Sequence, residues 1–284
     1  MASTEAGAAA VETLRGLDKD TLAMLGDLVA QSGWNQVPQD WALFSRLGSL
    51  CGVRDAGGKL VASGAVLPMG DSAAWISMIL VAPAVRGQGW GRRVFAHCLR
   101  NVQDAGRIPM LDATPAGARL YSQFGFAPLW HLTRWQRDAL PGATPAPPIA
   151  SPAPETLATF ASLDAEALGI SREPVLADLM ARADSRLVRS AGAAALVRTG
   201  RLAHHIGPLL ATHEPAAAAL VLDIARGLPG RVFIDVPDAR TEFRRQLAAA
   251  SFTPQRGLVR MALGEPVPAG QSAFIHAIAG PEFG

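Results

Sequence analysis

The sequence is poor in cysteine and has no long apolar run, and each scarcity excludes a class of protein. Its 284 residues hold two cysteines, Cys51 and Cys98, which are too few for a disulfide framework and indicate no zinc site. No stretch of about 20 apolar residues occurs, so we expect no membrane span. Residues 1–5 lack the basic and apolar regions of a signal peptide, which predicts a cytoplasmic protein.

The charge balance and the histidines exclude further classes. The 26 basic and 24 acidic residues leave a net charge of +2, which is too small to indicate a nucleic-acid partner. His204, His205 and His213 do not have convincing metal-ligand spacing with any carboxylate, so no metal site is expected. Hydrophobic residues make up 49% of the chain, enough for the core of one large domain or of two domains of about 140 residues.

A proline-rich segment, residues 139–153, divides the chain almost in half. It contains five prolines and no periodic pattern, and proline at that density prevents both a helix and a central strand. We therefore predict a first domain over residues 1–138, a linker over 139–153 and a second domain over 154–284.

Hydrophobic periodicity and turn residues predict the elements of the first domain. Helices are expected over residues 19–32, 38–47, 89–105 and 115–124. Strands are expected over 11–17, 49–54, 60–67, 73–81, 108–113 and 127–137. The expected element order is therefore β-α-α-β-β-β-α-β-α-β.

A glycine-rich turn follows the strand that ends at Val81. Arg86, Gly89 and Gly91 form an Arg-x-x-Gly-x-Gly pattern before a predicted helix, an arrangement that can cradle a phosphate on free backbone amides. Arg92 stands where the dinucleotide-binding pattern needs glycine, and no Gly-Lys-Ser/Thr follows, so neither common nucleotide motif fits. The plainer interpretation is a surface turn without a ligand.

This motif, the element order and a second motif together resemble the GNAT superfamily of acyl-CoA-dependent N-acetyltransferases. The second motif is Ala118-Arg119-Leu120-Tyr121 followed by Gly125-Phe126. The resemblance implies an α/β (mixed α+β) protein with two tandem GNAT folds, each a mixed, mostly antiparallel sheet flanked by helices. It extends to a bacterial subgroup in which an active-looking first domain precedes a degenerate second one.

An internal repeat supports two copies of one fold. Phe126-Ala127-Pro128 corresponds to Phe252-Thr253-Pro254, and Leu132-Thr133-Arg134 to Leu258-Val259-Arg260, at one constant offset. The second copy has no glycine where the first has its cradle, and Glu214 there would repel a pyrophosphate. We therefore expect one cofactor site, in the first domain, with acetyl-CoA as the cofactor.

The resemblance assigns the cofactor site residue by residue. The backbone N–H of Leu80 is expected to act as an oxyanion donor, and Tyr121, which is the only tyrosine, as the general acid that protonates the CoA sulfur. The alternative for Tyr121 is a half-buried core residue. The expected cofactor-binding residues are Ile79, Leu80, Val81, Arg86, Gly87, Gln88, Gly89, Trp90, Gly91, Arg92, Thr114, Gly117 and Tyr121.

The base and the acceptor site are less well defined by the sequence. Asp112, at the end of a predicted parallel strand, is the candidate base, and its alternative role is a turn or helix cap. A chain of water molecules is the other route for the proton. The expected acceptor-binding residues are Trp34, Asn35, Gln36 and Ser77.

The function expected from these features is acetyl-CoA-dependent N-acetyl transfer to an amine by direct attack in a ternary complex. The acceptor would be a small-molecule or peptide amine, and the protein a monomer or homodimer without nucleic-acid or membrane partners. The alternative is a non-catalytic acyl-CoA-binding or regulatory module that uses its second domain as an interaction surface. The absence of a carboxylate on the strand from Trp75 to Val81 favours that alternative mildly.

Overall fold

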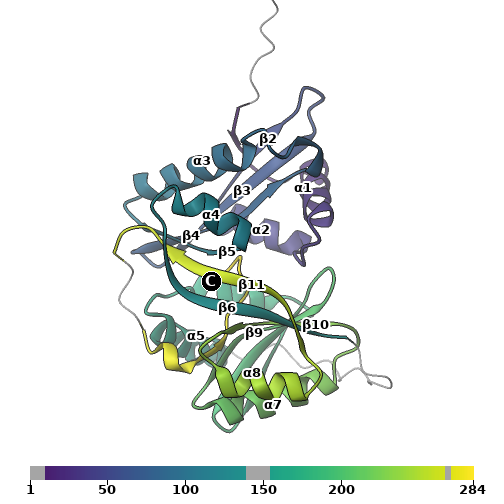
Figure 1. Cartoon of the computed structure of the whole chain (residues 1–284), viewed down its shortest axis with the longest axis vertical. Helices are drawn as coiled ribbons and strands as arrows, with labels where there is room; N and C mark the ends of the chain where they lie inside the picture. Colours follow the sequence, from purple (N-terminus) through teal and green to yellow (C-terminus); the bar gives the residue numbers. More distant parts are fainter. Residues whose placement is uncertain (1–9, 139–153, 266–269) are drawn as a thin grey trace, which may run out of the picture.

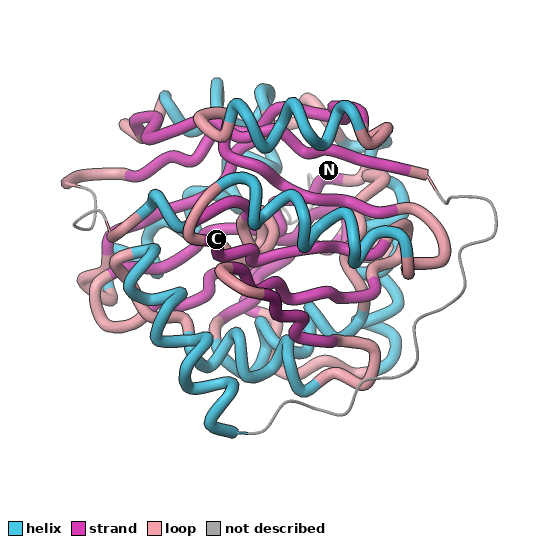
Figure 2. Tube along the Cα trace, turned by 90° about the horizontal axis from the view of Figure 1, so that it is seen from below, coloured by secondary structure: helices cyan, strands magenta, loops and turns pink. Residues whose placement is uncertain are grey.

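The computed structural model of the chain describes residues 10–138, 154–265 and 270–284. Within them twelve strands form one continuous sheet, with helices packed on it (Figure 1). Seen from below, helices lie on both sides of the strands (Figure 2). The predicted linker, residues 139–153, lies outside the described residues.

The first half contains the elements expected from the sequence. They are β1 (Glu12–Thr13), α1 (Lys19–Gln31), α2 (Pro38–Leu47), β2 (Ser49–Arg54), β3 (Leu60–Met69), β4 (Ala73–Val81), a 3-10 turn (Pro83–Val85), α3 (Trp90–Asp104), β5 (Ile108–Ala113), α4 (Pro115–Ser122) and β6 (Ala127–Arg137).

The second half repeats most of this order. Its elements are α5 (Pro154–Leu168), α6 (Glu173–Ala181), β7 (Arg186–Ser190), β8 (Ala193–Thr199), β9 (His204–Ala211), α7 (Glu214–Arg226), β10 (Val232–Pro237), α8 (Thr241–Ala249), β11 (Thr253–Ala262), a second 3-10 turn (Ser272–Phe274) and β12 (Ile275–Ala277).

Local signals account for the ends of several elements. Helix α1 begins at Lys19 because the Asp18 carboxylate accepts a hydrogen bond of 2.7 Å from the Thr21 amide. Thr114 caps α4 in the same way, accepting from the Gly117 amide at 3.2 Å. The strand expected over residues 11–17 is wrong in length: β1 covers Glu12–Thr13 and pairs only with Gly52 and Cys51 of β2.

The two halves exchange their last long strands. The order across the sheet is β1-β2-β3-β4-β5-β11-β6-β10-β9-β8-β7, and β12 pairs with β9. Strand β11, from the second half, therefore lies beside β5 of the first half, while β6 lies beside β10 (Figure 1). Strands β6 and β11 pair with each other along most of their length. The ranges expected from the sequence do not anticipate this exchange.

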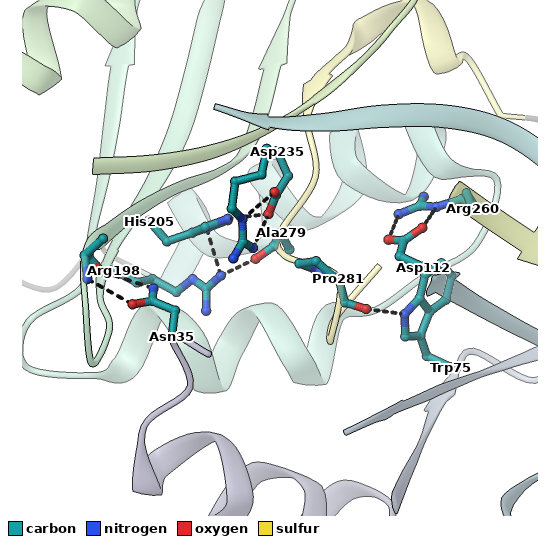
Figure 3. A network of polar contacts seen from close by, with 11 residues as sticks. Asn35, Trp75, Asp112, Arg198, His205, Asp235, Arg260, Ala279 and Pro281 are labelled. Atoms are coloured by element: carbon teal, nitrogen blue, oxygen red, sulfur yellow. Dashed lines mark hydrogen bonds and ion pairs between the residues drawn. The ribbon is translucent and has the colours of Figure 1, made fainter. Parts of the chain in front are cut away.

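Two buried ion pairs repeat across the exchanged strands. Asp112 on β5 holds Arg260 on β11, and Asp235 on β10 holds Arg134 on β6, each through two hydrogen bonds of 2.7–2.9 Å (Figure 3). In the internal repeat, Arg134 corresponds to Arg260. Upstream, Met110-Leu111-Asp112 corresponds to Phe233-Ile234-Asp235, which precedes a slightly longer helix in the second copy. Each pair therefore joins an aspartate of one copy to the arginine of the other, which is the relationship expected of a duplicated fold.

The residues 275–284, here called the 275–284 segment, run between the two halves. Ile278 donates its amide to the Asp235 carbonyl at 3.1 Å, and the Trp75 indole donates to the Pro281 carbonyl at 2.9 Å (Figure 3). The Phe283 ring stacks on Phe44 of α2, with ring centroids 5.7 Å apart. The segment is therefore bound to both halves at once.

The two cysteines lie in the core of the first half. Cys51 on β2 and Cys98 on α3 are buried, and their sulfur atoms lie 3.5 Å apart without a disulfide bond. The hydrogen bond to Cys51 and burial raise the pKa of Cys98 well above its usual value. A buried thiol with a raised pKa is a poor nucleophile, so the packing role is the one that the geometry supports.

The buried His205 makes stability depend on pH. Its Nε2 lies 3.0 Å from Asp235 and its Nδ1 lies 3.1 Å from the Arg198 guanidinium. A neutral ring therefore donates from Nε2 to Asp235 and accepts at Nδ1 from Arg198. Burial lowers its pKa to about 4. Because the unfolded chain binds this proton near pH 6.5, stability should be complete above that pH and fall by up to ~3 kcal/mol as the pH drops toward 4.

Urea unfolding of the wild type and of His205→Gln between pH 4.5 and 7.5 measures this effect. The variant should lose part of the slope of unfolding free energy against pH, because glutamine does not titrate. Parallel curves for the two proteins would show that His205 does not carry the pH dependence.

Candidate active site

Strand β4 separates from β5 halfway along its length. The two parallel strands pair only from Ala73 to Trp75, against Ile108 to Met110. Beyond that point β4 bulges: Met78 has a φ of +55°, and the register against β3 shifts between Ser63 and Ala65. The backbone of β4 beyond Trp75 is therefore free of β5, and the gap between the strands opens into a pocket.

A glycine on β3 allows the bulge to pack closely on α3. A Cβ atom added at Gly64 would lie 2.6 Å from Val94, 2.8 Å from the Cys98 sulfur and 2.9 Å from Ile79. No side chain fits there without moving the helix or the bulged strand. The absence of a side chain at Gly64 thus allows α3 to pack directly against the end of β4, where the glycine-rich turn begins.

The glycine-rich turn presents open backbone at the start of α3. Gly87 and Gly89 have φ values of +78° and +83°, and a Cβ atom on either would meet nothing within 4 Å. No side chain caps the helix, which starts at Trp90. Uncapped amides at a helix N-terminus, next to exposed glycines, suit an anion such as a pyrophosphate.

Three side chains of the turn have partners within the protein. The Arg86 guanidinium donates to the Val81 carbonyl at 3.2 Å. Arg92 donates to Gln123 at 2.7 Å and lies 4.7 Å from the Phe124 ring, which ties the start of α3 to the end of α4. Trp90 is half-buried and lies under the Arg93 guanidinium at 4.9 Å, so its side chain packs on the helix start.

Tyr121 is held by aromatic packing. Its ring centroid lies 4.3 Å from that of Phe95 on α3, and a Cβ atom at Gly117 would come within 3.0 Å of the Tyr121 ring. Among the described residues its hydroxyl has no hydrogen-bond partner. Burial raises the pKa of Tyr121 above its usual value, with Cys98 adding to the rise. The hydroxyl therefore carries its proton at neutral pH and can donate it.

The pocket in the β4–β5 gap, here called the β4–β5 pocket, has a volume of about 70 Å³. It brings together seven residues expected in the site: Trp34, Gln36, Ser77, Ile79, Asp112, Thr114 and Tyr121. The remaining lining residues are Ile76, Met78, Leu111, Ala113, Arg256, Leu258, Pro281 and Glu282. Leu80, Val81, Gly117 and residues 86–92 do not line it.

Asp112 does not have the environment of a free base. Its side chain is fully buried, and both of its oxygens accept hydrogen bonds from Arg260, at 2.9 and 2.8 Å. That guanidinium lies between the Trp75 and Trp130 rings, at 4.6 and 4.3 Å. Burial raises the pKa of Asp112, and Arg260 opposes that rise. The geometry makes Asp112 the counterion of Arg260 and does not support it as the base.

Asn35 also differs from its expected role. Its amide oxygen accepts from the backbone amides of Leu202 and Ala203, at 2.8 and 2.9 Å, and its amide nitrogen donates to the Ala203 carbonyl. All three bonds reach the turn between β8 and β9. Asn35 therefore fastens the first half to the second and does not face the β4–β5 pocket, unlike its neighbours Trp34 and Gln36.

The second half contributes two charged residues that the sequence did not reveal. Arg256 reaches the β4–β5 pocket from β11, and Glu282 reaches it from the 275–284 segment. Both are more than 120 positions from Tyr121 in the sequence, and no local motif marks either. Only the strand exchange and the course of the 275–284 segment bring them to the site.

The equivalent gap of the second half is filled by the chain itself. Strands β9 and β10 pair in parallel only at His204 and His205 before they separate. Strand β12 pairs with β9 beyond that point, at Leu209 and Leu210. A Cβ atom at Gly207 would lie 2.0 Å from the Ile278 carbonyl oxygen, so the backbones are in close contact where the first half has its pocket.

The turn before α7 is closed as well. The His213 ring accepts from the Ala216 amide at 3.1 Å and so caps the helix. Glu214 accepts from the Phe243 amide. Across the described ranges, no three histidine, cysteine or acidic side chains are grouped to hold a metal ion, and no helix has the length and apolarity to cross a membrane.

Comparison with known proteins identifies the fold and the family. Residues 48–128 match a model of the acetyltransferase (GNAT) domain, and residues 160–276 match another model with the same description. The chain therefore belongs to the GNAT acetyltransferase superfamily and carries two domains of this kind. The tandem GNAT fold, the mixed character of the sheet and the element order of the first half are confirmed, but the two halves share one continuous sheet and do not form two separate ones. A search of curated proteins finds no match.

Solved structures of low sequence identity share the fold over nearly the whole chain. A proposed acetyltransferase from Pyrococcus horikoshii is 18% identical, with a TM-score of 0.77 and coverage of 97% of this chain and 96% of its own. A tandem GNAT protein from the clavulanic acid biosynthesis pathway is also 18% identical, with a TM-score of 0.62 and coverage of 91% and 99%. A GCN5-related N-acetyltransferase from Sphaerobacter thermophilus is 15% identical, with a TM-score of 0.60 and coverage of 92% and 96%.

Proposed function

We propose that the protein is an acetyl-CoA-dependent N-acetyltransferase that moves an acetyl group to an amine by direct attack in a ternary complex. Membership in the GNAT superfamily supports acyl-CoA-dependent acetyltransferase activity in general. The observation that carries the proposal of direct N-acetyl transfer is the gap between β4 and β5. An open glycine turn follows the end of β4, and the protonated Tyr121 lines the pocket in the gap.

Each group of the site has a role in this reaction. Acetyl-CoA supplies an acetyl group activated as a thioester. Amides of residues 87–92 would hold its pyrophosphate, and Thr114 and Gly117 would border its pantetheine arm. A backbone N–H in the bulge of β4, where Ile79 lines the pocket, would stabilise negative charge on the reacting oxygen. Leu80, the donor predicted from the sequence, pairs instead with Ser63 of β3 and does not line the pocket. Tyr121 would give its proton to the departing sulfur.

We infer that the first half alone binds CoA. The filled gap between β9 and β10 and the capped, glycine-free start of α7 support this inference. Leu247, which corresponds to Tyr121 in the repeat, is fully buried in the second core and has no proton to donate. The second half would then complete the acceptor side of the site.

Two measurements test the proposal. Calorimetry should detect binding of CoA, and a thiol-release assay over a library of amines should detect turnover with acetyl-CoA. Absence of CoA binding would contradict the proposed function. Tight CoA binding without transfer to any amine would instead favour the non-catalytic binding module.

Substituting Gly89 tests the pyrophosphate cradle without knowledge of the acceptor. Gly89→Ala places a side chain at a φ of +83°, a strain of roughly 1–2 kcal/mol that the turn relieves by shifting. The dissociation constant for CoA should rise about tenfold. Gly58→Ala is the matched control, because this hairpin glycine has a φ of +82° and equally open surroundings. Equal effects of the two substitutions on CoA affinity would place the pyrophosphate elsewhere.

A further inference from the structure

The β4–β5 pocket contains an unusual group of buried polar atoms. Gln36 Oε1, Ser77 Oγ, Arg256 Nε and Glu282 Oε2 all lack a hydrogen-bond partner, and all four residues line this one pocket. Gln36, Ser77 and Glu282 are only 6%, 9% and 8% exposed. Native proteins rarely leave buried polar atoms unpaired, and a cluster of them indicates a place for a polar ligand.

The two charged members of this group have opposite sign and do not pair with each other. Among the described residues neither Arg256 nor Glu282 takes part in an ion pair. The Arg256 guanidinium lies 6.0 Å from the Trp34 ring, which offers an apolar wall beside it. The pocket therefore presents a cation and an anion at separate positions.

Burial leaves both charges in need of a partner. It raises the pKa of Glu282, a rise that Arg198 opposes, and it lowers the pKa of Arg256 to about 10. Each shift means that the site disfavours the charged form. A ligand that brings the opposite charge to each residue would offset that cost.

The 275–284 segment fixes Glu282 in place from both sides. Ala279, before it, accepts from Arg198, and Pro281 accepts from Trp75 at 2.9 Å (Figure 3). Phe283, after it, packs on Phe44. Gly280, with a φ of +130° that favours glycine, lies close beneath it: a Cβ atom there would lie 2.9 Å from the Glu282 carboxylate. The carboxylate is held by its backbone, while its Oε2 stays free for a ligand.

We propose that the acceptor is a small amino acid, whose ammonium group binds Glu282 and whose carboxylate binds Arg256. This assignment rests on the proposed acetyl transfer and narrows its substrate class. The unpartnered Gln36 and Ser77 atoms would complete the hydrogen bonds of the ligand. The pocket volume of about 70 Å³ suits a ligand of a few heavy atoms.

The proton balance gives Glu282 a chemical role. The bound ammonium gives one proton to the Glu282 carboxylate and becomes a nucleophile. Its nitrogen bonds to the acetyl carbon, the carbon–sulfur bond breaks, and Tyr121 protonates the sulfur. Tyr121 regains a proton from the new amide nitrogen through solvent, and Glu282 releases its proton to solvent. The products are an N-acetyl amino acid, free CoA and one proton.

Paired substrates test the assignment on the intact protein. Glycine, β-alanine and the standard L-amino acids are compared with the matching amines that lack the carboxylate, using acetyl-CoA and detection of free thiol. At least one amino acid should have a kcat/KM about 100-fold above that of its matching amine. Arg256→Met should bring this ratio close to one, whereas Arg15→Met, which removes an exposed charge, should leave it unchanged.

Glu282→Gln tests the other end of the pocket. Turnover should fall at neutral pH and recover as the pH rises, because free amine then replaces the ammonium form. CoA affinity and melting temperature report whether each variant is folded. The acceptor assignment would be overturned if the wild type used the matching amines as well as or better than the amino acids. It would also be overturned if the protein bound CoA but turned over no amino acid. Failure to bind CoA would instead overturn the proposed function itself.

Discussion

A Tyr121→Phe variant is expected to lower kcat for the best amine of the thiol-release screen by about 10²- to 10⁴-fold, the usual contribution of a positioned general acid. The ring should stay in place, because its contacts with Phe95 and Gly117 do not involve the hydroxyl. The substitution removes no hydrogen bond, because the hydroxyl has no polar partner in the described part of the chain. Steady-state kinetics with acetyl-CoA measures the effect. The CoA affinity of the variant checks that it is folded.

The raised pKa of Tyr121 allows a second test of this prediction, the pH dependence of kcat. Since burial keeps the hydroxyl protonated, wild-type kcat should not fall between pH 7 and 9 through loss of this proton. An unchanged kcat in Tyr121→Phe would mean that solvent protonates the sulfur, and Tyr121 would then be a packing residue.

Replacing Asp235 with alanine should cost about 3–5 kcal/mol of folding free energy, because it leaves a buried arginine without its counterion. Asp235 has no exposed side-chain surface and binds Arg134 through two bonds of 2.7 Å and His205 through one of 3.0 Å. These three donors lower its pKa against the effect of burial. The stabilisation is therefore present at neutral pH and is lost as the pH falls into the strongly acidic range. Urea unfolding at pH 7 measures the loss.

An exposed ion pair provides the matched control. Asp138 holds Arg231 at the same distance of 2.7 Å, but the two side chains are 75% and 45% exposed. Asp138→Ala should change stability by less than about 1 kcal/mol. The double variant Arg134→Met with Asp235→Leu should recover most of the loss, since it removes both buried charges. A small effect of Asp235→Ala alone would show that Arg134 finds solvent or another partner.

The local structure of the first half could be predicted from its sequence. Strand β4 ends at Val81 and α4 begins at Pro115, as the apolar run and the Thr114 cap indicate. The glycine turn lies between β4 and α3 in an open conformation. These features depend on neighbours a few positions away, so the order of residues determines them directly.

The acceptor side of the site could not be predicted in the same way. Asp112 looked available because its partner, Arg260, lies 148 positions away on an exchanged strand. Asn35 looked like a pocket residue because its bonds go to a turn 168 positions away. Glu282 and Arg256 reach the pocket through topology alone. Periodicity and spacing along one stretch of sequence carry no information about such pairings.

The exchanged strands also set the order in which the protein can fold during synthesis. Strand β5 leaves the ribosome early, but its neighbour β11 begins about 140 residues later, which corresponds to roughly 10–30 s of translation. For that time β5 has an unpaired edge, and such edges can bind other chains. The first half therefore cannot complete its sheet until nearly the whole chain has been made, and the two domains reach their final state together.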